Sequence, residues 1–145
     1  AFLSVDPAPS FEESQSLDDL EEIYMNTSLP LFKRYRAMFS LRDLNTDASA
    51  LVLAKGLQDS SALFRHEVAY VLGQLMRSVV VPALSTCLET ADEHSMVRHE
   101  AAEALGAIGG AEAEEVLARF TDHEDEVINQ SCVVALDTVE YWKAF

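Results

Sequence analysis

The amino-acid sequence reads FRHEVAYVLGQL over residues 64–75 and VRHEAAEALGAI over residues 97–108. The Arg, His, Glu, Ala, Leu and Gly of the two blocks coincide at a constant offset of 33 residues, from position 64 to position 97. Weaker copies flank the pair and read LFKRYRAMF over residues 31–39 and VINQSCVVAL over residues 127–136. A period of this length is the signature of stacked structural units. The sequence therefore predicts four similar repeats.

Each repeat predicts two helices joined by a turn. The first helices are expected over about 31–44, 62–76, 95–108 and 124–141, and the second helices over about 47–57, 79–89 and 111–119. Pro82 falls in the first turn of a second helix, where proline is tolerated. Each hairpin can bury its apolar face only against its neighbours. The predicted fold class is therefore all-α, an α-solenoid of about four helical hairpin repeats.

The N-terminal part of the chain has a different composition from the repeats. Residues 1–30 contain seven acidic residues and no Lys or Arg. Proline and serine in its first half predict an acidic arm or linker over residues 1–15, and Ser16 is expected to begin a short helix. The repeat domain is expected over residues 16–145. Its repeats are placed at about 31–60, 61–94, 95–122 and 123–145.

The composition excludes several classes of protein. The 145 residues carry 25 acidic and 10 basic side chains, a net charge of −15, which disfavours nucleic acid and anionic membranes and favours a basic partner. The apolar runs are far shorter than the roughly 18 residues of a membrane span. Two cysteines are too few for a disulfide framework, so a reducing, cytoplasmic location is expected. The missing initiator Met indicates a processed protein or a piece of a longer one.

The two repeated histidines lie opposite the apolar faces of their helices. At about 100° per residue, the apolar side chains gather on one side of each helix and His66 or His99 lies on the other. The apolar sets are Phe64, Val68, Val71, Leu72 and Leu75 in one helix and Val97, Ala101, Ala104, Leu105 and Ile108 in the other. A core histidine is therefore disfavoured at both positions.

Two interpretations of the His-Glu pairs then stay open. They are either exposed pairs copied by duplication or a metal site. The outer repeats keep the apolar face but carry Arg34-Tyr35 and Asn129-Gln130 in place of His-Glu, which favours the metal site. Equivalent positions on packed helices lie about 8–10 Å apart, so two imidazoles could share one ion.

The expected metal ligands are His66, His99 and one of the adjacent carboxylates, Glu67 or Glu100. Two His and one carboxylate with open positions are typical of non-haem Fe(II) enzymes that activate oxygen, and zinc also accepts these ligands.

Two glycines follow the histidines by seven residues on the same helix face. Gly73 and Gly106 lie in mid-helix, where glycine costs about 1 kcal/mol against alanine. Either a substrate approaches the backbone there or a neighbouring helix packs closely; the pattern favours neither. His94 and His123 fall in acidic turns and are expected to be solvated. Cys87 and Cys132 are expected to be packing residues.

The two strong blocks, together with YRAMFSLR over residues 35–42 and LSVDPAP over residues 3–9, closely resemble the deoxyhypusine hydroxylase family of HEAT-like repeat proteins. The resemblance implies two halves, each of four helical hairpins with two His-Glu motifs, that face each other across a di-iron centre. It implies a monooxygenase that uses dioxygen to hydroxylate deoxyhypusine, a modified lysine of a translation factor, to hypusine.

The resemblance covers only the C-terminal half of that family, with the linker between the halves at its start. The missing N-terminal half, with two further His-Glu motifs, is then an expected partner, and this half alone is expected to be inactive and to bind iron incompletely. Self-association of two copies could mimic the missing half. The resemblance makes His66, His99 and Glu100 the iron ligands, and assigns Glu67 to the substrate's cationic side chain or to the metal.

Two other functions compete with the hydroxylase half. One is a non-catalytic HEAT-like interaction module whose His-Glu pairs are incidental. The other is a solenoid with a structural metal site, such as zinc, and no redox chemistry. In the hydroxylase interpretation, Gly73 and Gly106 line the space that receives the substrate.

Overall fold

A computed structural model describes residues 6–145, and helices form the regular structure of this part of the chain. The helices are α1 (Leu17–Met25), α2 (Leu31–Leu44), α3 (Asp47–Lys55), α4 (Ala62–Leu75), α5 (Val81–Glu89), α6 (Ser95–Ile108), α7 (Ala111–Ala118) and α8 (Glu126–Lys143). Short 3-10 turns follow α3, at Gly56–Gln58, and precede α5, at Ser78–Val80. The predicted all-α class is confirmed.

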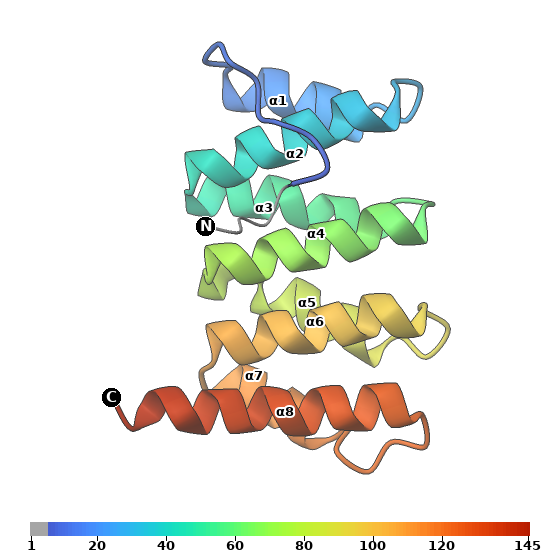
Figure 1. The fold of residues 1–145 in the computed structure, drawn as a ribbon, viewed down its shortest axis with the longest axis vertical. Coiled ribbons are helices and arrows are strands. Elements are labelled where there is room, and N and C mark those ends of the chain that lie inside the picture. Colours follow the sequence, from blue (N-terminus) through green and yellow to red (C-terminus); the bar gives the residue numbers. More distant parts are fainter. Residues whose placement is uncertain (1–5) are drawn as a thin grey trace, which may run out of the picture.

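The helices stack in two layers, as expected for a solenoid. Figure 1 shows α2, α4, α6 and α8 side by side in one layer, with α3, α5 and α7 behind them. Within the first layer, α6 packs more extensively against α4 and α8 than α2 packs against α4. Equivalent positions of successive repeats therefore meet across this layer. Every helix of the described chain is either too short or too polar to span the hydrocarbon of a bilayer.

The helix starts follow local capping signals. The hydroxyl of Ser16 accepts a hydrogen bond from the backbone N–H of Asp19, and the hydroxyl of Ser61 accepts one from Phe64. Thr46 and Ser49 form a reciprocal capping box at the start of α3. Both α4 and α6 begin and end within one residue of their predicted bounds, and α6 is capped by the side chain of His94.

Four predicted helix boundaries differ from the structure by two residues. The helix expected over 79–89 begins with the 3-10 turn and becomes α-helical only at Val81, because Pro82 has no N–H and fits only the first turn. The last helix begins at Glu126 and ends at Lys143, each two residues later than expected. The helix expected over 47–57 ends at Lys55, where the 3-10 turn Gly56–Gln58 replaces its last residues. Helix ends vary by this much whenever no strong cap fixes them.

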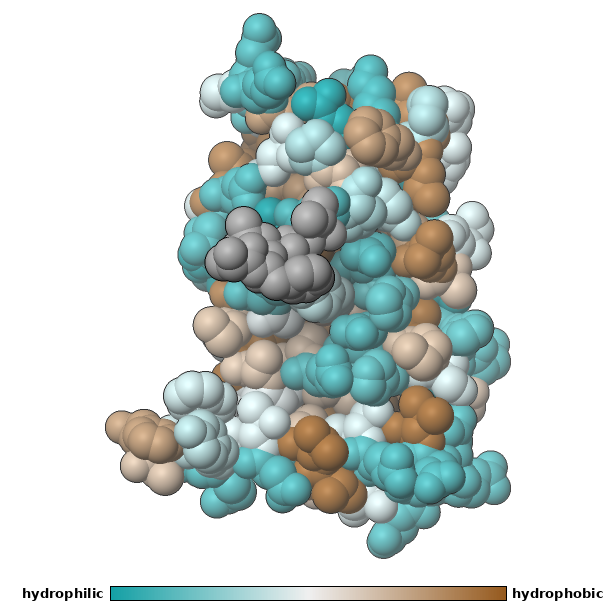
Figure 2. Space-filling model, in the orientation of Figure 1, coloured by the Kyte–Doolittle hydropathy of each residue, from teal (hydrophilic) through white to brown (hydrophobic). Residues whose placement is uncertain are grey.

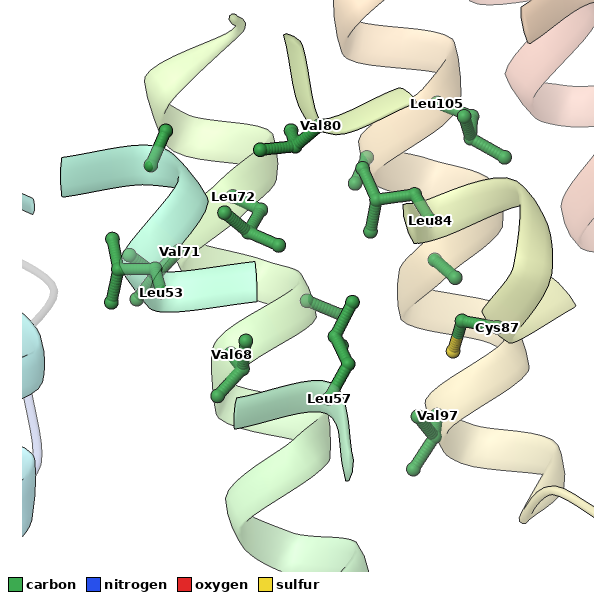
Figure 3. Packing of buried hydrophobic residues seen from close by; sticks show 14 of the residues in the cluster. Leu53, Leu57, Val68, Val71, Leu72, Val80, Leu84, Cys87, Val97 and Leu105 are labelled. Carbon is green, nitrogen blue, oxygen red and sulfur yellow. The ribbon is translucent and has the colours of Figure 1, made fainter. Parts of the chain in front are cut away.

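The core lies between the two layers. Figure 3 shows Leu57, Val68, Leu72 and Leu84 filling the space between the helices. The predicted apolar faces of α4 and α6 are buried apart from their last residues, Leu75 and Ile108, which are half-buried. The helical period thus decided which face of each helix points inward, and the opposite face of α4 and α6 carries the His-Glu pairs.

Three arginines, Arg34, Arg65 and Arg98, hold equivalent positions and join each repeat to the one before it. Tyr35-Arg36 therefore occupy the His-Glu positions of the first repeat, so the sequence alignment that placed Arg34-Tyr35 there was wrong by one residue. The Nε of Arg34 donates to the carbonyl of Tyr24, and the Nε of Arg98 donates to the carbonyl of Leu88, both at 2.9 Å. Arg65 donates to the carbonyl of Asp59. These bonds satisfy carbonyl groups near the ends of the preceding segments, where a helix offers them no partner. The arginine of the repeated motif is therefore a structural anchor.

Residues 6–15 lie against α2, and Figure 1 shows this segment crossing it. The guanidinium of Arg36 donates to the carbonyls of Pro9 and Ser10, and Arg42 forms an ion pair with Asp6 at 2.8 Å. Ala8 is buried. The predicted acidic arm over residues 1–15 is thus partly packed on the first repeat. Its residues 1–5 lie outside the described part of the chain.

Candidate metal centre

The predicted site residues come from two neighbouring helices of the first layer. His66 and Glu67 lie in the second turn of α4, and His99 and Glu100 occupy the same place in α6. Figure 2 shows hydrophilic residues gathered over the middle of these two helices, on the face that Figure 1 presents to the viewer. The stack of repeats brings the two His-Glu pairs to one surface.

Glu100 lies between the two imidazole rings. Its Oε1 atom is 3.2 Å from Nε2 of His66 and 4.0 Å from Nε2 of His99. Both histidines therefore direct the same ring nitrogen toward one carboxylate, although they belong to different repeats. Glu67 lies at the edge of this group, with its Oε1 atom 3.8 Å from Nδ1 of His66.

A third glutamate joins the group that the sequence predicted. The Oε1 atom of Glu103 is 3.2 Å from Nε2 of His99, one turn further along α6. Ligand atoms of His99, Glu100 and Glu103 all lie within 4.8 Å of one another. Glu103 was not among the predicted site residues, because the preceding repeat carries Tyr70 at the matching position. Its i,i+4 spacing from His99 was the signal that could have found it.

The carboxylates of the site are partly removed from water. The side chain of Glu100 is 13% exposed and that of Glu103 is 55% exposed. Burial raises the pKa of Glu100 and the pKa of Glu67 above their ordinary values, and the charge of His66 opposes the rise in both. A cation held among these groups would favour their charged forms, because it offsets the cost of burying a carboxylate.

These residues fit a divalent transition metal. Imidazole nitrogens and carboxylate oxygens are the donors that iron and zinc share. The Nδ1 atom of His66 is buried without a hydrogen-bond partner in the described chain, while its Nε2 atom points into the group. The donor atoms come from two helices, with His66 on α4 and the other three residues on α6. His99, Glu100 and Glu103 already form the tight part of the set, and His66 extends it.

The two glycines make close helix contacts. A Cβ atom added to Gly73 would lie 3.1 Å from the Cα of Ala104, and one added to Gly106 would lie 2.9 Å from the Cα of Ala135. Both glycines therefore make the close helix contact that the packing interpretation requires. Gly73 also borders a hollow of about 200 Å³ between α4 and α6, beside Glu100 and Glu103. Gly106 is buried under α8.

The remaining histidines and cysteines lie away from this group. His94 and His123 each accept a backbone hydrogen bond through Nδ1, from Met96 and Asp125, so the expectation that they are simply solvated was incomplete. Both cysteines are buried. Burial raises the pKa of Cys87 to about 12 and the pKa of Cys132 to about 11. Both thiols are therefore protonated at neutral pH, as expected for packing residues.

The repeats of this chain match known families of helical repeats. HEAT repeats match residues 51–137, and the PBS lyase HEAT-like repeat matches residues 33–59. The chain belongs to the HEAT-repeat family. Within this family, it is 52% identical over 140 residues to deoxyhypusine hydroxylase of Drosophila pseudoobscura pseudoobscura and 49% identical over 140 residues to that of Danio rerio. Each match covers 97% of this chain and 46% of the relative.

A solved structure shows the same HEAT-repeat fold. Human deoxyhypusine hydroxylase in complex with glycerol superposes with a TM-score of 0.92 at 50% identity, over 97% of this chain and 48% of that one. The chain thus spans about half the length of the curated relatives it matches. It aligns with about half of each deoxyhypusine hydroxylase that it matches.

Proposed function

We propose that this chain forms one half of a di-iron monooxygenase that hydroxylates deoxyhypusine on a translation factor to hypusine. The observation that carries the proposal is the position of Glu100 between His66 and His99, in a chain that matches half of known deoxyhypusine hydroxylases. The proposed iron ligands are His66, His99 and Glu100. Glu103 is close enough to His99 to share in holding the ion.

Iron held by His66, His99 and Glu100 would supply the activation of dioxygen, in which one oxygen atom enters a C–H bond of the substrate and the other becomes water with two electrons from a reductant and two protons. The protein residues hold and orient the reacting groups. Glu67 sits at the edge of the site, half-buried, with its Oε1 atom near His66. A carboxylate in that place can pair with the ammonium of a long cationic side chain. We assign Glu67 to the substrate first and to the metal second.

The hollow beside Gly73 suits the alkyl part of such a side chain. The residues that line it include the small Ala69, Ala104 and Ala107 and the acidic Glu100 and Glu103. Methylene groups can cover these alanines while an amine meets a carboxylate. We keep Gly73 in the proposed substrate space, whereas the contact of Gly106 with Ala135 favours a packing role for that glycine.

The proposed partners are a second half with two further His-Glu motifs and a translation factor that carries deoxyhypusine. The net charge of −15 suits a basic protein substrate. We place the protein in the cytoplasm and assign residues 1–15 to the linker between the halves. Repeats at about 31–60, 61–94, 95–122 and 123–145 complete the proposed domain layout.

Iron binding and activity test this function. The chain alone should bind Fe(II) weakly or incompletely, with or without self-association, as measured by equilibrium dialysis and sedimentation equilibrium. Mixed with a complementary half of a deoxyhypusine hydroxylase, it should bind two irons per pair and add one oxygen atom to deoxyhypusine, as measured by mass spectrometry.

Other results would overturn the proposal. Tight binding of two irons by a strict monomer would contradict the need for a second half. A pair that binds zinc but never hydroxylates would support a structural metal site. A pair that binds no metal would support a non-catalytic interaction module.

A further inference from the structure

Ser131, on the last helix, makes a direct contact with a residue of the candidate metal centre. Its Oγ atom lies 2.6 Å from Nδ1 of His99, across the interface between α6 and α8. Ser131 is 8% exposed, so little water competes for this contact. The repeat that contains Ser131 has Asn129 and Gln130 in place of a His-Glu pair, yet it reaches the site through this hydroxyl.

The position of one hydrogen follows from the surroundings of Ser131. Its Oγ atom also forms a hydrogen bond with the carbonyl oxygen of Val127, one turn earlier in α8. A carbonyl oxygen only accepts, and a hydroxyl has a single hydrogen to donate. That hydrogen points to the carbonyl oxygen of Val127, because this oxygen lies 2.5 Å from Oγ of Ser131 and the two atoms would repel without a hydrogen between them. The lone pairs of the hydroxyl then accept a hydrogen from Nδ1 of His99.

This assignment decides which nitrogen of His99 is free. With Nδ1 carrying its hydrogen, the neutral ring has its lone pair on Nε2, the atom that faces Glu103 at 3.2 Å and Glu100 at 4.0 Å. In the metal-free chain these carboxylates, which only accept, favour a hydrogen on Nε2, whereas the short contact with Ser131 favours one on Nδ1. A cation between Nε2 and the carboxylates removes this conflict. Metal-binding histidines generally donate their second N–H to a fixed acceptor, which sets the tautomer and the ring orientation.

We propose that Ser131 is a positioning residue that holds His99 in the Nδ1–H tautomer and directs its Nε2 atom to the metal. The inference rests on the proposed metal site but concerns a contact that exists without the ion. His66 differs, because its Nδ1 atom has no hydrogen-bond partner in the described chain. Ser131 thus makes the two histidines of the site inequivalent.

The tautomer of His99 is measured directly in the metal-free chain. Nitrogen chemical shifts of ¹⁵N-labelled histidine, taken at a pH where the ring is neutral, should show the hydrogen on Nδ1 in the native protein. In Ser131→Ala the signal of His99 should move toward the Nε2–H form. A native His99 with its hydrogen on Nε2, or a tautomer unchanged by Ser131→Ala, would overturn the proposal whether or not the chain binds metal.

Metal affinity gives the second measurement, made with Fe(II) alone under anaerobic conditions. Ser131→Ala should weaken binding about 10–100-fold, the range for outer-shell partners of metal ligands, and Ser131→Thr should restore it because the hydroxyl is kept. Thr138→Ala is the matched control: it removes the same kind of hydroxyl bond to a carbonyl, that of Val134, from the same helix. An equal loss of Fe(II) affinity in Thr138→Ala would show that Ser131 has a merely structural role. So would a loss of affinity in Ser131→Ala that is matched by a fall in its melting temperature.

These measurements separate the two proposals. If the native chain and its pair with the complementary half bind no metal, the proposed function fails. The nitrogen shifts still decide whether Ser131 sets the tautomer of His99.

Discussion

The Nε2 atom of His66 on α4 lies 3.2 Å from the Oε1 atom of Glu100 on α6. This contact joins two repeats at the centre of the candidate metal site. Glu100 also faces His99, so it is the one residue that lies near the histidines of both repeats. The first prediction concerns this carboxylate.

Glu100→Gln should weaken Fe(II) binding by more than about 10-fold, since even outer-shell partners of a metal are worth 10–100-fold. The metal-free melting temperature should not fall, because burial raises the pKa of Glu100 and a neutral amide avoids a partly buried charge. Glu115→Gln, on the exposed face of α7, is the control for net charge. Equal affinity in Glu100→Gln and the control would remove Glu100 from the ligand set.

Gly106→Ala should destabilise the protein more than Gly73→Ala. The added Cβ would lie 2.8–3.0 Å from Ala135 in the first case and 3.1–3.2 Å from the nearest atoms of Ala104 in the second. Overpacking of this kind costs about 1–3 kcal/mol, which exceeds the gain of about 1 kcal/mol from replacing a helical glycine. Urea unfolding measures both. A stabilised Gly106→Ala variant would contradict the packing role.

Arg34→Met should lower the free energy of unfolding by about 3–5 kcal/mol, because it leaves a buried charge without its partner. The guanidinium pairs with Asp59 at 2.7 Å, where both side chains are 6% exposed, and it stacks over the ring of Phe64. Thermal and urea unfolding measure the loss. Arg119→Met is the control: it breaks an exposed ion pair with Glu89 and should lower the free energy of unfolding by less than about 1 kcal/mol. Adding Asp59→Asn to Arg34→Met should recover part of the loss.

Glu93 should make the stability of the protein depend on acid pH. Burial alone would raise its pKa, but hydrogen bonds from Arg65 and from the backbone of His94 hold the pKa of Glu93 below its ordinary value of 4.5. The stabilisation is therefore complete above pH 4.5 and is lost as the pH falls through the lower pKa of the folded state. Glu93→Gln should remove this part of the pH dependence.

At neutral pH, Glu93→Gln should lower the free energy of unfolding by about 1.5–3 kcal/mol, which is the value of hydrogen bonds to charged groups. Arg65 contacts both carboxylate oxygens of Glu93, and the Glu93 side chain is only 10% exposed. Urea unfolding between pH 3 and pH 7 measures both effects. Parallel pH profiles for the native protein and Glu93→Gln would show that the Arg65 pair adds nothing.

Much of the fold could be predicted because its signals are local. The capping residues Ser16, Thr46 and Ser61 lie within three residues of the backbone groups they bind. The apolar period of α4 and α6 gave the buried face, and with it the outward direction of His66 and His99. The end of α8 was misplaced because it depends on weak terminal hydrogen bonds rather than on a strong cap.

The sequence by itself determined the repeat, the helices and the side of each helix that carries the His-Glu pairs. Only the tertiary structure decided which carboxylates meet which imidazoles. It placed Glu100 between His66 and His99, added Glu103, brought Ser131 to His99 and set Gly73 and Gly106 against neighbouring helices. The physical reason is that the period of a helix fixes only the direction in which each of its side chains leaves the helix axis. The rotation and sliding of one helix against the next come from packing between residues some 30 positions apart, and a shift of one residue would separate these groups.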